Sequence, residues 1–139
     1  MILFLDTSVL LAACGSETGA SRWIFRLAKA NRWQLVVTAY VVTEVERNLP
    51  AIGPEGQCRS AIGLVPDVWT VAQLTVFPVA KDRPVLFSAF AWSDVLLTLD
   101  SHDFARLLGF DYYGMAIMKP SEFLMRERQE GRLVQPTDA

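Results

Sequence analysis

The feature that most constrains the fold is a series of short apolar runs separated by segments with helical periodicity. Two clear runs are residues 2–5 (ILFL) and residues 95–99 (VLLTL). Strands that are apolar along their whole length are typical of parallel sheets, because helices cover both faces of such a sheet. We therefore expect an α/β fold, a three-layer α/β/α arrangement around a central, mostly parallel sheet of four to five strands.

The expected elements alternate along the chain. Strands are expected at residues 2–5, 34–38, 74–79, 95–99 and 115–118, and helices at residues 20–30, 39–49, 82–91, 103–108 and 121–129. Pro50 is expected to end the helix that precedes it. Glycines and prolines make residues 50–66 difficult to assign, and a short helix near residues 56–64 is one interpretation.

Length and composition indicate one globular domain. The 139 residues are 52% apolar and 20% charged, which predicts a folded domain over residues 1–130 and a frayed tail over residues 131–139. No apolar run is long enough to cross a membrane, and the N-terminus lacks a signal-peptide pattern, so we expect a cytoplasmic protein with no membrane partner. A net charge of −2 argues against a protein that binds nucleic acid by charge alone.

Acidic residues follow the expected strands at one edge of the sheet. Asp6 and Asp100 come directly after strands, Asp82 begins the helix after the third strand, and Glu44 lies in the second turn of the helix after the second strand. Sites in open α/β sheets form just beyond the carboxyl ends of the strands, where these four acids are expected to meet. Asp94 precedes its strand and is therefore about 20 Å from Asp100, at about 3.3 Å per residue.

Helix periodicity selects Glu44 from its neighbours. Val41 and Val45 define the expected inward face of this helix, and Glu44 borders that face, whereas Glu46 turns farther toward solvent. Asn48, one turn after Glu44, is a candidate hydrogen-bond donor behind the site.

The four acids together predict a divalent cation. Clustered carboxylates repel one another and raise one another's pKa unless a cation neutralises them, although each acid alone could serve as a helix cap or a solvated surface residue. A chain with two cysteines and one histidine has too few residues for a disulfide framework or an ordinary zinc site. Oxygen ligands favour Mg²⁺ (or Mn²⁺).

The same residues carry a resemblance to a known family. The ordered segments resemble those of the PIN-domain ribonucleases, including the VapC-like toxins: FLDTSVLLAA, VVTAYVVTEVERNL, KDRPVLFSAF, LLTLDSHDF and IMKPSEFL. The resemblance covers residues 1–125. It implies that the metal-binding and catalytic acids are Asp6, Glu44, Asp82 and Asp100. It also makes Asp103 a secondary acid, with helix capping as its alternative role, and makes Thr7 and Ser8 the hydroxyl residues beside the first acid.

The resemblance further implies an activity and partners. Such a site hydrolyses RNA phosphodiester bonds with metal-bound water, and Lys81, Arg83 and Arg47 are candidate phosphate contacts. Small PIN proteins of this kind often act as the toxin of a type II toxin–antitoxin pair and form homodimers. The expected partners are therefore RNA, a cognate antitoxin and a second copy of the chain.

Two other functions are weighed against this one. A phosphotransfer domain with Asp6 as phosphoryl acceptor lacks the second Asp that such phosphatases carry two residues later, because position 8 is Ser. A non-catalytic PIN-like module for binding RNA or protein remains the main alternative, since a fold alone does not establish an activity.

Overall fold

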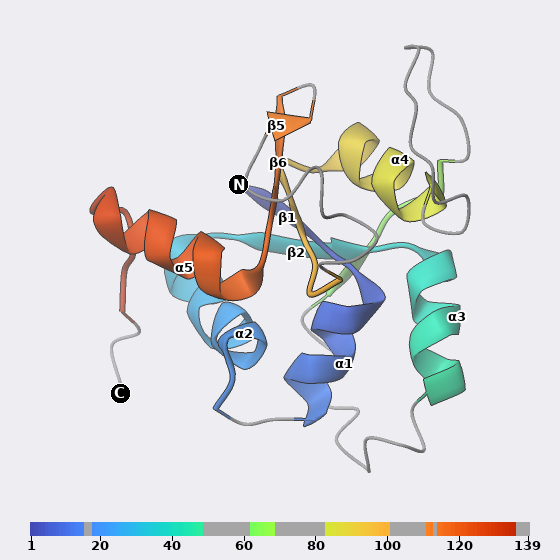
Figure 1. Ribbon diagram of the computed structural model, residues 1–139, viewed down its shortest axis with the longest axis horizontal. Coiled ribbons are helices and arrows are strands. Elements are labelled where there is room, and N and C mark those ends of the chain that lie inside the picture. The colour runs from blue at the N-terminus through green and yellow to red at the C-terminus, as the bar shows by residue number, and fades with distance from the viewer. Residues whose placement is uncertain (16–17, 49–61, 69–82, 101–110, 113, 136–139) are drawn as a thin grey trace.

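The computed structural model of the chain describes residues 1–15, 18–48, 62–68, 83–100, 111–112 and 114–135. Six strands in these segments form one sheet in the order β3-β2-β1-β4-β6-β5 (Figure 1). Their bounds are β1 Ile2–Leu5, β2 Gln34–Val37, β3 Gly63–Leu64, β4 Val95–Leu97, β5 Asp111–Tyr112 and β6 Met115–Met118. All neighbouring strands are parallel except β5 and β6, so the expectation of a mostly parallel sheet is confirmed.

The described residues contain two short strands that the sequence does not predict, whereas the strand expected at residues 74–79 and the helix expected at residues 103–108 lie outside the described residues. β3 and β5 contain two residues each, which is too short for a periodicity to reveal a strand. The interpretation of a short helix near residues 56–64 is wrong for residues 63–64, and residues 56–61 lie outside the described residues. Residues 63–64 pair in parallel with Val36 and Val37 of β2 instead, because the open edge of β2 offers backbone donors and acceptors that need partners.

The centre of the sheet is fully buried on both faces. Leu3, Phe4 and Leu5 of β1, together with Leu96 and Leu97 of β4, are 0% exposed. β1 pairs with β2 on one side and β4 on the other, with Leu5 opposite Leu97. This burial explains why the apolar runs do not alternate with polar residues.

Five helices cover the sheet: α1 Thr7–Gly15, α2 Ala20–Asn31, α3 Ala39–Asn48, α4 Arg83–Trp92 and α5 Pro120–Gln129. Figure 1 shows α1, α2 and α5 on one side of the sheet and α4 on the other, which gives the predicted three layers. Pro120 occupies the first position of α5, where its missing N–H costs nothing. None of the helices in the described part of the chain is long and apolar enough to cross a membrane.

The chain after α5 lies against α2. Asn31 Nδ2 donates to the carbonyl of Val134 at 2.8 Å, and the Val134 N–H donates to Asn31 Oδ1 at 2.7 Å. Residues as far as Gln135, which the sequence places in a frayed tail, are thus described and partly bonded to the domain.

Cys14 on α1 is disulfide-bonded. Disulfides are rare in the reducing cytoplasm, so this bond does not favour the expected cytoplasmic location.

Candidate active site

The candidate site begins where β1 and β4 end side by side. Asp6 follows β1 directly, and its backbone N–H donates to the carbonyl of Leu97 at 3.0 Å. The carbonyl of Asp6 accepts the N–H groups of Val9 and Leu10, each at 3.1 Å, and so begins α1. The side chain of Asp6 is therefore fixed at the carboxyl edge of the sheet, as the sequence predicts.

Both carboxylate oxygens of Asp6 accept hydrogen bonds. Oδ1 accepts the backbone N–H of Thr7 at 2.8 Å, while Oδ2 accepts the hydroxyls of Thr98 at 2.7 Å and Ser8 at 3.1 Å. The Asp6 residue is only 7% exposed. The carboxylate is held rigidly in a nearly dry environment.

This environment raises the pKa of Asp6 above its ordinary value. Desolvation by burial is the largest cause, and the negative charge of Asp100 raises the pKa further. Hydrogen bonds from Thr98, Thr7 and Ser8 lower it, but burial outweighs them. A carboxylate in this state favours either a proton or a nearby cation.

Thr7 links Asp6 to Glu44. While its N–H binds Asp6, its hydroxyl donates to Glu44 Oε1 at 3.1 Å. Helix α3 presents Glu44 at the border of its buried face, since Val41 and Val45 are 0% and 1% exposed and Glu44 is half-buried. The helix periodicity expected from the sequence is confirmed. Thr7 contacts both Asp6 and Glu44, two of the predicted acids.

Asp100 reaches the same network through its backbone. Its N–H donates to Thr98 Oγ1 at 3.0 Å, and the neighbouring Leu99 N–H donates to Ser8 Oγ at 3.0 Å. The Thr98 hydroxyl therefore connects the backbone of Asp100 to the carboxylate of Asp6. This arrangement brings the two acids within electrostatic reach of each other.

Asp94 lies elsewhere, and Asn48 contacts Glu44 through its backbone. The Asp94 carboxylate accepts the N–H of Ile2 at 2.7 Å, at the start of β1 and thus at the opposite edge of the sheet. Asn48 Nδ2 donates to the backbone carbonyl of Glu44 at 2.9 Å and not to its carboxylate.

Two predicted acids, Asp82 and Asp103, lie outside the described residues, as does Lys81. In the part of the chain that the structure describes, no three Asp, Glu, His or Cys side chains form a group that could hold a metal ion. The predicted four-acid centre therefore stays a prediction.

The sequence analysis missed two residues near the site. Thr98 is fully buried and contacts Asp6, and its signal was a hydroxyl at the end of an apolar strand, two residues before an acid. Asp67 follows β3 and accepts the N–H of Tyr40 at 3.3 Å, at the start of α3. The sequence gives no sign of its position, because β3 has only two residues and Asp67 therefore follows no expected strand.

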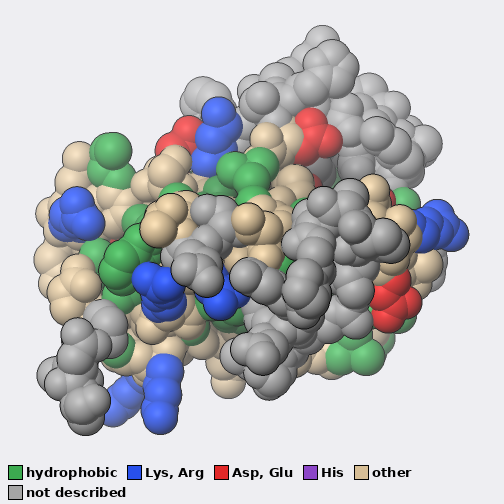
Figure 2. All heavy atoms as spheres, turned by 90° about the horizontal axis from the view of Figure 1, so that it is seen from below, with side chains coloured by type: hydrophobic (Ala, Val, Ile, Leu, Met, Phe, Trp, Pro, Cys, Tyr) green, Lys and Arg blue, Asp and Glu red, His purple; other side chains and the backbone are tan. Residues whose placement is uncertain are grey.

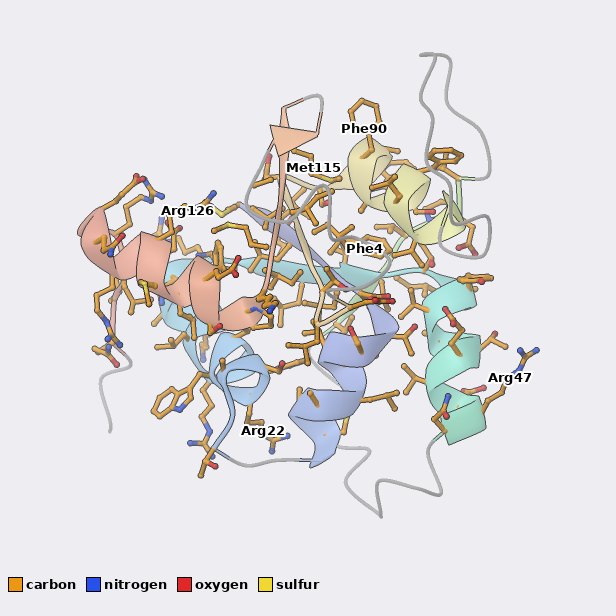
Figure 3. All side chains as sticks on the ribbon, in the orientation of Figure 1. Phe4, Arg22, Arg47, Phe90, Met115 and Arg126 are labelled. Carbon is orange, nitrogen blue, oxygen red and sulfur yellow. The ribbon has the colours of Figure 1, made fainter. Side chains whose placement is uncertain are left out.

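Asp67 and Glu44 share a cleft with a basic residue. The cleft has a volume of about 300 Å³ and is lined by Ala39, Tyr40, Thr43, Glu44, Arg47 and Asp67. Figure 3 shows Arg47 pointing outward from α3 toward solvent. Asp67 Oδ1 is buried without a hydrogen-bond partner, a costly state that a donor or a cation would relieve.

The donor set fits Mg²⁺ or Mn²⁺ in its chemistry. The side chains in the described site offer carboxylate and hydroxyl oxygens and no sulfur or imidazole. Hard divalent cations prefer such ligands. The desolvation of Asp6 and its repulsion by Asp100 are both reduced when a cation is close.

Comparison with known proteins supports the fold. No protein-family model and no curated protein matches the chain. Among solved structures, it is similar to a chain in the crystal structure of VapBC2 from Rickettsia felis bound to a DNA fragment from their promoter. The TM-score is 0.56 and the identity 14%, over 84% of this chain and 97% of that chain. At this identity the similarity shows the fold alone, which is a three-layer α/β/α fold of the PIN type.

Proposed function

We propose that this chain is a metal-dependent endoribonuclease of the PIN type that hydrolyses RNA phosphodiester bonds. The observation that supports this most is the buried Asp6 carboxylate. Burial raises its pKa, and the negative charge of Asp100 raises it further. Perturbed carboxylates at the carboxyl edge of a parallel sheet are typical of functional sites. Asp6, Glu44, Asp82 and Asp100 are the proposed ligands and catalytic residues.

The residues of the chain have distinct proposed roles. Asp6 and Asp100 would hold Mg²⁺ (or Mn²⁺), and Thr7 would orient Glu44 toward it through the hydroxyl contact at 3.1 Å. When bound, such a cation supplies a nucleophilic hydroxide at neutral pH and neutralises charge on the phosphate. Thr98 and Ser8 would hold the Asp6 carboxylate in one orientation, so that little reorganisation is needed during the reaction.

The biological role we propose is that of a VapC-like toxin in a type II toxin–antitoxin pair. The support is the shared fold with a chain of a VapBC2 complex, together with the ordered acids of the sequence. A cognate antitoxin and a homodimeric assembly belong to this proposal. So does a cytoplasmic location, which the disulfide at Cys14 does not favour. The second candidate is a non-catalytic PIN-like module that binds RNA or protein, because a shared fold alone does not establish an activity.

An RNA cleavage assay separates the two candidates. Purified protein is incubated with RNA and Mn²⁺ or Mg²⁺, with and without EDTA, beside the variants Asp6→Asn and Asp100→Asn. We expect metal-dependent cleavage that EDTA abolishes and that both variants lose by at least about a hundredfold, as for removal of a catalytic group. Asp94→Asn is the matched control, because this acid lies at the opposite edge of the sheet. Cleavage that persists in both site variants contradicts the nuclease, and RNA binding without cleavage under either metal favours the module.

A further inference from the structure

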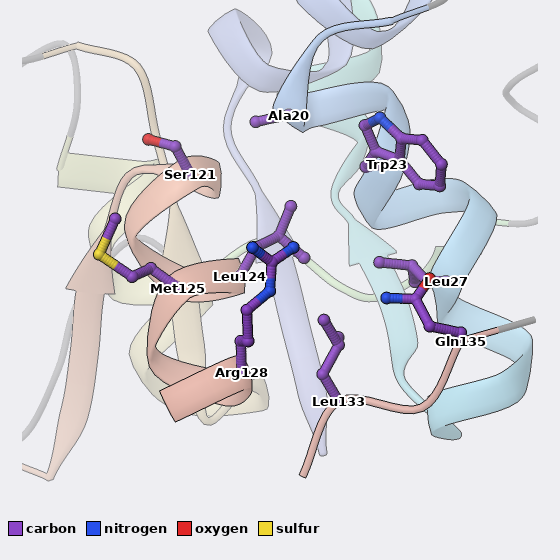
Figure 4. Close-up of a pocket in the computed structure, with 9 residues that line it drawn as sticks. All are labelled: Ala20, Trp23, Leu27, Ser121, Leu124, Met125, Arg128, Leu133 and Gln135. Atoms are coloured by element: carbon purple, nitrogen blue, oxygen red, sulfur yellow. The ribbon is translucent and has the colours of Figure 1, made fainter. Parts of the chain in front are cut away.

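A groove between α2 and α5 lies apart from the candidate active site. It has a volume of about 350 Å³ and is lined by Ala20, Trp23, Leu27, Ser121, Leu124, Met125, Arg128, Leu133 and Gln135 (Figure 4). Most of these side chains are apolar, and none of them is a candidate carboxylate. The ribonuclease proposal therefore leaves the groove without a role.

Large apolar side chains remain accessible along this groove. Trp23 is 38% exposed and Met125 is 59% exposed, and both line it. Val134, in the chain segment beside it, is 52% exposed. Several exposed apolar side chains gathered in one place, as opposed to scattered singly, are typical of a binding surface.

The end of the groove formed by residues 133–135 is fixed in place. Asn31 on α2 holds Val134 through two hydrogen bonds of 2.8 and 2.7 Å, and the same amide also donates to the Leu27 carbonyl at 2.9 Å. At the end of α5, the Arg132 and Leu133 N–H groups both donate to the Glu127 carbonyl. The groove is consequently pre-formed, and a ligand does not have to order its walls.

The two chain segments that line the groove are rich in basic residues, although the protein as a whole is acidic. Residues 20–35 and 120–135 contain seven of the thirteen Lys and Arg residues and only three of the fifteen Asp and Glu residues. Two of the seven, Arg126 and Arg132, form ion pairs with Glu127 and Glu130, so the excess of positive charge comes from the other five. Figure 2 shows one face of the molecule, on which most of the visible Lys and Arg side chains gather in the left half. Arg128 lines the groove itself, and Arg26 stacks over the Trp23 ring at 5.2 Å.

We infer that this groove binds an acidic amphipathic helix of a partner protein. A helix can lie between α2 and α5 with its apolar side chains in the groove, and its acidic side chains would meet Arg128 and Arg26 at the rim. The apolar lining favours a protein segment over nucleic acid, which contacts proteins mainly through charged phosphates. The inference does not depend on the ribonuclease proposal, because no residue of that site takes part.

Selection from a random peptide library tests this inference. The full-length protein is the bait for displayed peptides of about 15 residues, long enough for about four helical turns. Enriched sequences should combine Asp and Glu with large apolar residues spaced three or four apart. No enrichment, or enrichment of basic peptides, contradicts the proposal.

Variants then locate the binding surface. Met125→Glu and Arg128→Glu should each weaken the selected peptides by about tenfold or more, as expected for central contact residues. Met125 is mostly exposed, so its replacement should leave the fold intact, which circular dichroism can verify. Leu64→Glu and Arg47→Glu are matched controls, because both residues are exposed and lie outside the groove.

Three outcomes would overturn the proposal. The first is an equal loss of peptide binding in the control variants. The second is displacement of the peptides by an RNA oligonucleotide, together with loss of RNA binding in Arg128→Glu. This result would make the groove a nucleic-acid surface. The third is self-association that disappears in Met125→Glu, which would assign the groove to a second copy of the chain.

Discussion

Replacement of Asp6 by Asn, measured without divalent metal, should stabilise the protein at neutral pH. Asp6 is 7% exposed, and desolvation raises its pKa despite three hydrogen bonds. The ionised carboxylate therefore costs folding free energy. Asn keeps an oxygen for the Thr7 N–H, and the two N–H groups of its amide can donate to Thr98 Oγ1 and Ser8 Oγ, so the contacts at 2.8, 2.7 and 3.1 Å have replacements.

The expected gain is modest but measurable. Removing one such unfavourable group commonly adds about 0.5–2 kcal/mol to the free energy of unfolding. For a domain of this size the gain corresponds to a rise in Tm of about 2–8 °C. Thermal unfolding followed by circular dichroism in EDTA is the assay. Asp94→Asn, at an exposed acid, is the matched control and should give no such gain.

The gain should depend on pH in a defined direction. Because the pKa of Asp6 is raised in the folded state, the folded protein binds the proton more tightly than the unfolded chain does. The ionised Asp6 carboxylate lowers the free energy of unfolding. This loss is absent below the pKa of the unfolded chain, about 3.9, and grows as the pH rises toward the pKa of the folded protein. Asp6→Asn should thus match the parent protein near pH 3 and exceed it at pH 7. A variant less stable than the parent at pH 7, or a gain of equal size at both pH values, refutes this reasoning.

Three further predictions concern packing and positioning. Phe123→Ala, at a side chain that is 0% exposed, should lower the free energy of unfolding in urea by about 3–5 kcal/mol, and a loss under about 1 kcal/mol would contradict its place in the core. Asn31→Ala removes two hydrogen bonds to Val134 and should speed carboxypeptidase trimming of the C-terminus, with a stability loss of about 1–2 kcal/mol; unchanged trimming would show that the contacts do not hold this segment. Thr7→Val removes the hydroxyl that binds Glu44 and should weaken Mn²⁺ binding in calorimetry by about tenfold or more with little change in Tm, whereas unchanged affinity would exclude a positioning role.

Much of the fold follows from local sequence patterns. The apolar runs at β1 and β4 predicted central strands because burial on both faces leaves no place for polar side chains. On α3, Val41 and Val45 predicted the buried face and so the orientation of Glu44. Each of these patterns involves only residues that are close together in the sequence, so the sequence alone reveals it.

Other features depend on contacts between distant segments. β3 exists because two residues complete the edge of β2, and neither has a strand pattern of its own. Asp67 was missed along with that strand. Thr98 contacts Asp6 across a separation of 92 residues, and no local pattern shows this contact. The groove likewise arises only where α2 meets α5, which is about a hundred residues later in the chain.

Direct titration with Mn²⁺, followed by electron paramagnetic resonance, tests the proposed metal site most directly. The parent protein should bind Mn²⁺ saturably, and Asp6→Asn and Asp100→Asn should each weaken this binding by at least about tenfold. Asp94→Asn should bind as the parent does, since Asp94 bonds to Ile2 at the opposite edge of the sheet. Equal Mn²⁺ binding by the parent and by both site variants, or no binding by the parent at all, would contradict a carboxylate metal centre at this edge.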